Sequence, residues 1–269
     1  MHKIGLLAWI TFKDSIRNKA LHGILFCGIV LFAVNIIVTG MFTWEMGKVA
    51  VDMGLSIVSF SGLILIFFFS INVMSNDIDR KTIYLILSRP IGKPQYIMGK
   101  YAGLAMIIIL SSIILGLCSA GSVWVSILGT KTFLPPNFSW SLFFLSIGFL
   151  TLSLLVMMGL TLLWVSITSH SFTALILSMM TYFIGQNMEN VKNIISSTKF
   201  LSPDSLSVKT IHAVSWVVPN LAVFDLKTTA AYGLSVDAAS LLWTALYGIS
   251  YIGISLIITI FVFQKRELS

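Results

Sequence analysis

Charged residues are scarce in this 269-residue chain, and long stretches have none at all. Asp, Glu, Lys and Arg together make up 10% of the residues, whereas hydrophobic residues make up 57%. Soluble domains carry about 25% charged residues, so this composition excludes an ordinary soluble domain. The uncharged stretches are instead long enough to cross a bilayer, since a hydrocarbon core of ~30 Å needs about 20 helical residues.

Groups that bind metals or nucleotides are also sparse. The two cysteines, Cys27 and Cys118, lie inside apolar stretches, where we expect them to act as small apolar residues. The four histidines lack the paired spacing of a metal site. A phosphate-binding loop ends in Gly-Lys-Ser or Gly-Lys-Thr, and none of the Gly-Lys pairs of this chain is followed by Ser or Thr. We therefore expect no metal, no cofactor and no catalytic site on this chain.

Six uncharged apolar stretches predict six transmembrane helices. Such long runs without alternation favour helices over a β-barrel. The absence of carboxylates within them argues against an ion-coupled carrier and against an intramembrane enzyme. The predicted class is therefore an all-α, polytopic integral membrane protein that forms a single domain over residues 1–269. The predicted spans are Leu21–Phe42, Met53–Met74, Tyr101–Leu128, Ser141–Ile167, Thr173–Met188 and Leu241–Phe263. The fifth is short, and its alternatives are an extension past Glu189 and Lys192 to Ile195 or a break near Gly185.

The positions of the cations predict the orientation. With both termini inside, residues 1–20 hold 4 Lys and Arg, residues 75–100 hold 5 and residues 264–269 hold 2, which makes 11 of the 17. Cations near span ends tend to stay in the cytoplasm, so we expect an N-in, C-in topology. This bias accounts for most of the net charge of +7, and a nucleic-acid partner is not expected. We expect the plasma (inner) membrane of a prokaryote, with membrane lipids as neighbours.

Residues 1–20 form a cationic head before the first apolar stretch. At helical spacing their apolar side chains gather on one side and their charged side chains on the other. The apolar side consists of Ile4, Ala8, Phe12 and Ile16, and the charged side includes Lys3, Lys13 and Arg17. The head is either an interfacial amphipathic helix or an ordinary cationic flank that anchors the topology.

The densest charge cluster lies in residues 75–100, between the second and third spans. Ser75 or Asn76 can cap a new helix, with Asp77 and Asp79 placed favourably in its first turn. This helix would end before Pro90, because proline pushes the preceding residue out of the helical region. A charged end and an apolar middle suit a docking element for a soluble partner. A solvated connector between two spans is the alternative.

Residues 189–240, on the predicted outer side, are too long for a simple connection. Leu206, Ile211, Val214 and Val218 recur at roughly helical spacing, and Pro219 ends the run. We expect re-entrant helices here, which dip toward the outer leaflet before the last span.

Two stretches resemble the ABC type-2 exporter permeases. Asp77–Ile91 followed by Tyr96–Gly103 is similar to that family's loop, with its acidic residue, its Lys-Thr or Gly-Thr pair, its Pro-Ile stop and its Gly-Lys step. Lys81 stands where many members have Gly. Pro219-Asn220-Leu221 and Phe224-Asp225 resemble the motifs before the last span of a subgroup with large outer loops. With the six-span layout, the resemblance extends over essentially the whole chain.

The resemblance implies the membrane-spanning permease subunit of an ATP-driven exporter. This chain and a second copy or paralogue would form the path, and two separate ATPase subunits, which carry ATP and Mg, would dock beneath. Met1–Lys19 would be the interfacial connector helix, and Pro219, Leu221 and Phe224 would narrow the outer exit. The implied ATPase-coupling residues are Asp77, Asp79, Arg80, Lys81, Thr82, Ile83, Leu85, Ile86, Arg89 and Pro90. The alternatives are a membrane anchor that recruits an ATPase without passing substrate, and an uncoupled lipid scramblase.

Overall fold

The computed structural model describes residues 2–41, 46–79, 92–130, 138–168, 170–197 and 218–265, and every regular element within them is helical. The predicted all-α class is therefore confirmed. The elements are α1 (His2–Ile16), α2 (Lys19–Thr39), α3 (Met46–Ile64), the π-helix η1 (Leu65–Ser70), α4 (Ile71–Asp79), α6 (Lys93–Thr130), α7 (Trp140–Ile167), α8 (Ser171–Ser197), the 3-10 helix η2 (Leu221–Phe224), α10 (Lys227–Tyr232) and α11 (Ala238–Lys265).

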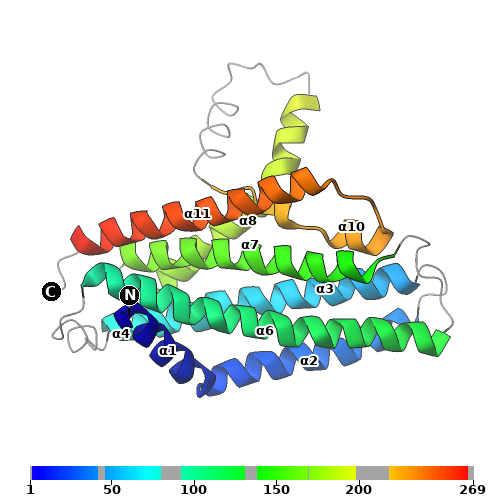
Figure 1. Ribbon diagram of the computed structural model, residues 1–269, viewed down its shortest axis with the longest axis horizontal. Coiled ribbons are helices and arrows are strands. Elements are labelled where there is room, and N and C mark those ends of the chain that lie inside the picture. The colour runs from blue at the N-terminus through cyan, green and yellow to red at the C-terminus, as the bar shows by residue number, and fades with distance from the viewer. Residues whose placement is uncertain are drawn as a thin grey trace.

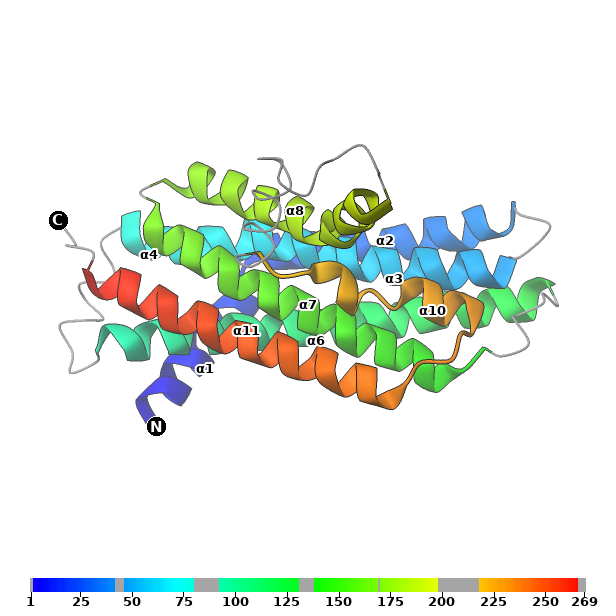
Figure 2. The ribbon, with the colours of Figure 1, turned by 90° about the horizontal axis from the view of Figure 1, so that it is seen from above.

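The long helices form a bundle, and the two termini lie at the same end of it (Figure 1). Five of the described helical segments are long and apolar enough to cross a membrane, among them the continuous run of α3, η1 and α4. These five coincide with five of the six predicted spans. Seen from above, α8 lies on one side of α7 and α11 on the other (Figure 2).

The predicted span Thr173–Met188 is helical, within α8, but α8 is not among these five segments. Gln186 and Asn187 interrupt its apolar run, and Figure 1 shows its C-terminal part leaving the bundle. The chain returns beside α8 at Pro219, and η2 and α10 then pack along α3 and α7. The span Thr173–Met188 therefore remains a prediction, and η2 packs beside α8 in this part of the bundle.

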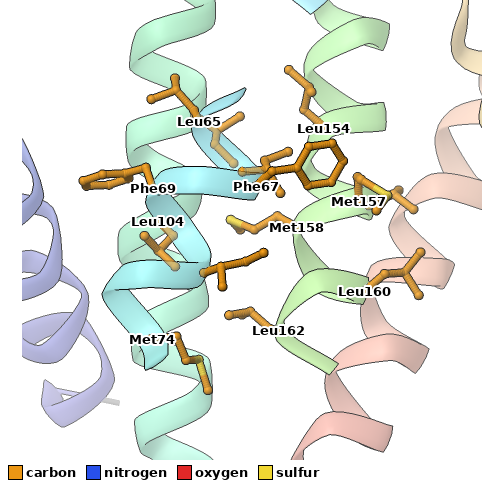
Figure 3. Close-up of a cluster of buried hydrophobic side chains, with 14 of the residues drawn as sticks. Leu65, Phe67, Phe69, Met74, Leu104, Leu154, Met157, Met158, Leu160 and Leu162 are labelled. Atoms are coloured by element: carbon orange, nitrogen blue, oxygen red, sulfur yellow. The ribbon is translucent and has the colours of Figure 1, made fainter. Parts of the chain in front are cut away.

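The bundle core lies where η1 and α4 pack against α6 and α7. Figure 3 shows this cluster, with Leu65 from η1, Leu104 from α6 and Met158 from α7. All three side chains are at most 1% exposed. The paired methionines Met157 and Met158 fill this core, which agrees with the flexible packing role that thioether side chains have in proteins.

The second span is not a uniform α-helix. In η1 the backbone hydrogen bonds reach one residue further than in an α-helix, as the bond from the Ile71 N–H to the Ile66 carbonyl shows. The Ser70 hydroxyl also donates to the carbonyl five residues earlier, that of Leu65, at 3.4 Å. Single π-helical turns inside α-helices occur often at functional sites. Periodicity in the sequence does not reveal this turn.

A buried amide joins three helices on the predicted outer side. Asn35 of α2 donates to the Ala50 carbonyl of α3 and to the Ser122 hydroxyl of α6, both at 3.3 Å. Its carbonyl accepts from the Thr39 hydroxyl at 3.1 Å. Interhelical hydrogen bonds of this kind hold helices together in lipid, so Asn35 lies at a packing seam.

Candidate functional site

The head of the chain is a helix that lies against the start of α6. Leu7, Ala8, Thr11 and Ser15 of α1 are buried, while Lys3, Lys13 and Arg17 are exposed on the other side. The buried side is turned by about one residue from the predicted one, since Ile4, Phe12 and Ile16 are only half-buried. The predicted helix is thus present, and α6 determines which of its sides is covered.

Two glycines of α6 allow this close contact. A Cβ atom at Gly99 would lie 2.7 Å from the Cβ of Leu7, and one at Gly103 would lie 2.6 Å from the Cβ of Thr11. Glycines spaced by four residues let helix backbones approach closely in membranes. The seam between α1 and α6 therefore depends on Gly99 and Gly103.

The first turn of α6, which follows the predicted cytoplasmic loop, is held by contacts at both of its sides. The Gln95 side chain accepts from the Gly92 N–H at 3.3 Å, which is half of a capping box. The Lys93 ammonium donates to the Gln264 carbonyl at 3.2 Å, in the last turn of α11. The fully buried rings of Tyr96 and Phe263 stack with their centroids 6.0 Å apart. α6 and α11 are therefore fastened together beside the loop.

The approach to the loop differs from the prediction. α4 runs without interruption from Ile71 to Asp79, so the predicted helix start at Ser75 or Asn76 is wrong. The Ser75 hydroxyl is hydrogen-bonded to the Ser171 hydroxyl of α8 and does not serve as a cap. Asp77 and Asp79 therefore belong to the last turns of a helix that comes out of the bundle.

Most of the implied coupling residues lie outside the described part of the chain. These are Arg80, Lys81, Thr82, Ile83, Leu85, Ile86, Arg89 and Pro90. The structure does describe the two helices that flank these residues. α4 precedes them and α6 follows them.

The three gate candidates come together in one buried element. Leu221 and Phe224 begin and end η2 and are at most 1% exposed, and Pro219, two residues before Leu221, is also buried. The Asn220 side chain caps η2 by accepting from the Ala222 N–H at 3.2 Å. The Phe224 ring stacks on Tyr247 of α11 at 6.0 Å. Pro219, Leu221 and Phe224 thus pack between α8 and α11.

Sequence reasoning missed an ion pair beside this element. The Asp225 carboxylate and the Lys227 ammonium are 3.2 Å apart, and the same carboxylate accepts from the Lys227 N–H at 3.1 Å. The Gln186 amide of α8 lies 3.5 Å from it. The two charged side chains are 28% and 18% exposed, so they are neither fully buried nor on an open surface.

The ion pair lies at about half the depth of the bundle. It borders a cavity of about 10 Å³ together with Ser59 of α3, Ser153 of α7 and Tyr182 of α8. Each of these residues lies near the middle of its helical run. The cavity has room for about one water molecule. An ionisable pair at this depth is a candidate functional site, because charge in the hydrocarbon region is costly.

Of the comparisons with known proteins, the one against protein families found a match. The comparison with curated proteins gave no match. The family model of the ABC-2 family transporter proteins matches residues 6–268. That match extends from α1, through both flanks of residues 80–91 and the η2–α10 segment, past the end of α11. Because it covers nearly the whole chain, this multi-pass membrane protein belongs to the ABC-2 transporter family and is the membrane component of an ABC transporter.

Proposed function

We propose that this chain is one of two permease subunits of an ATP-driven exporter and that residues 75–100 bind separate ATPase subunits. Closure of the ATPases on ATP would move the loop, and the helices attached to it would open a path outward by rigid-body motion. The observation that carries this proposal is the packing of the start of α6, beside the loop, against both α1 and α11. A push on the loop can reach the spans because the start of α6 is fastened to both α1 and α11.

The length of α6 supports this transmission. It has 38 residues, which corresponds to about 57 Å at 1.5 Å per residue, nearly twice the ~30 Å of a hydrocarbon core. One continuous helix therefore connects the loop with the far side of the bilayer. Along it lie the contact with α1 at Gly103 and the contact with α7 at Gly116.

The ion pair supports a path along the side of α3, α8 and η2. Asp225 and Lys227 are partly exposed at mid-depth, where lipid contact would be costly for either charge. Whatever covers this side must therefore be water or protein. A second permease subunit that encloses a water-filled path there satisfies this requirement.

The docking role of the loop is tested by the double replacement Leu85→Asp and Ile86→Asp. Two carboxylates placed in an apolar groove of the ATPase would cost several kcal/mol without counter-charges. We expect pull-down of the ATPase from membranes to be lost while membrane insertion persists. Charge reversal at Arg80 and Lys81 should reduce recovery of the ATPase less than the double Asp replacement does. This reduction should be larger at low salt than at high salt.

The control is Leu234→Asp, which places one such carboxylate on an exposed leucine between α10 and α11. This position is on the predicted outer side, so recovery of the ATPase should not change. Unchanged recovery with the double Asp variant would exclude the loop as the docking element. Loss of recovery with Leu234→Asp would show that the assay reports general damage.

A further inference from the structure

A long apolar groove lies between α6 and α7 on the outside of the bundle. Its volume is about 580 Å³, within the ~300–1,000 Å³ range of ligand pockets. Ile113 and Leu117 of α6 and Phe144 of α7 form its rim and are about half exposed, at 52%, 60% and 49%. The groove therefore opens toward the surroundings of the bundle rather than toward its core.

Two glycines, which have no side chain, create the groove. Gly148 of α7 lines it, and a Cβ atom built there has nothing within 4 Å. Gly116 of α6 faces it as well, and its Cβ would meet only Ile147, at 3.0 Å. The floor is fixed from behind, because Leu152 packs against Gly248 of α11. The shape of the groove is thus determined by side chains of three long helices, α6, α7 and α11.

An aromatic cluster places one end of the groove at the membrane interface. Trp140 lies 6.1 Å from Trp124, 5.3 Å from Phe138 and 6.3 Å from Phe144, measured between ring centroids. Tryptophans gather at the level of lipid headgroups. Phe144 belongs both to this cluster and to the rim of the groove. The groove therefore begins just below the headgroups of the predicted outer leaflet.

The length and chemistry of the groove fit one hydrocarbon chain. From Phe144 to Leu155, α7 rises about 17 Å, close to the ~15 Å thickness of one leaflet. The Thr151 hydroxyl in the groove already donates to the Ile147 carbonyl at 2.7 Å, so it does not need a hydrogen-bond acceptor from a ligand. We propose that this groove binds one acyl chain of a membrane phospholipid, with the headgroup beside Trp124 and Trp140.

The test uses the full chain in phosphatidylethanolamine–phosphatidylglycerol vesicles with a small fraction of phosphatidylcholine that carries a diazirine on one acyl chain. After illumination, mass spectrometry of peptides locates the cross-links. We expect them to concentrate on residues 109–117 and 144–155. Gly148→Leu fills the groove and should reduce labelling there severalfold. Gly121→Leu, the matched control on α6, also has nothing within 4 Å but lies outside the groove, so it should leave labelling unchanged.

Two results would overturn the proposal. Cross-links spread over all exposed apolar side chains in the unaltered protein, with no excess in the groove, would show ordinary surrounding lipid only. A groove that escapes lipid labelling, while Gly148→Cys forms a disulfide between two copies, would show that protein covers it. The distribution in the unaltered protein decides the question even if Gly148→Leu does not fold.

Discussion

The seam between α1 and α6 can be opened at one position. A Cβ atom at Gly103 would lie 2.6 Å from the Thr11 Cβ and 2.8 Å from the Ala8 carbonyl oxygen. Because that oxygen belongs to the backbone of α1, rotation of a side chain cannot relieve the contact. In Gly103→Val the whole of α1 must therefore move away from α6.

The size of the effect follows from this overpacking. Inserting atoms into a packed contact costs about 1–3 kcal/mol, and uncovering Leu7, which is 7% exposed, costs a similar amount. A loss of about 2 kcal/mol in the seam corresponds to a roughly 30-fold change in the ratio of docked to undocked α1. Gly103→Ala should show a smaller change in the same direction.

The opening can be measured with a cysteine at Ser15, which is on the covered side of α1 and only 3% exposed. In a protein without Cys27 and Cys118, Gly103→Val should raise the rate at which Ser15→Cys reacts with a thiol reagent by up to roughly 30-fold. The control is Gly121→Val, also in α6, where a Cβ atom has nothing within 4 Å. An unchanged reaction rate in Gly103→Val would refute the close-packed seam.

Two further predictions concern the ion pair and the topology. Lys227→Met leaves Asp225 unpaired at mid-depth and should lower stability by about 1–3 kcal/mol, less than for a fully buried pair because of the partial exposure. Adding Asp225→Asn should restore part of the loss in thermal unfolding, and no recovery would show that the two residues are not coupled. In intact cells, cysteines at Ser88 and Ser269 should resist an impermeant thiol reagent and one at Ser207 should react. Labelling at Ser88 from outside would contradict the predicted orientation.

The spans were predictable because the bilayer imposes a simple requirement. Twenty uncharged apolar residues have few alternatives to a membrane helix, and five predicted spans coincide with helices that meet it. The helix at residues 2–16 followed from periodicity, but its covered side did not. Which of Ile4, Leu7 or Thr11 is buried depends on Gly99 and Gly103, nearly a hundred residues later in the chain.

The ion pair could not be predicted for a related reason. Hydropathy averages neighbouring residues, so it assigns Asp225 and Lys227 to an outer loop on account of their charge and their distance from the last span. Their depth depends on a tertiary contact, in which the chain returns along α8 and Pro219 lies against Gly185. The Phe224-Asp225 motif was the available signal, and it indicated the segment without indicating its depth. The docking role of residues 80–90 remains a prediction.

The π-helix η1 makes the second span one residue longer than a continuous α-helix between the same end points. Deleting one residue within Leu65–Ser70 would let this turn become α-helical, while α3 and α4 still present the same sides to their neighbours. A deletion elsewhere in α3 would rotate everything beyond it by about 100°, turning buried side chains outward. Natural length variation in this span should therefore be confined to η1, directly before α4, which leads into the predicted cytoplasmic loop.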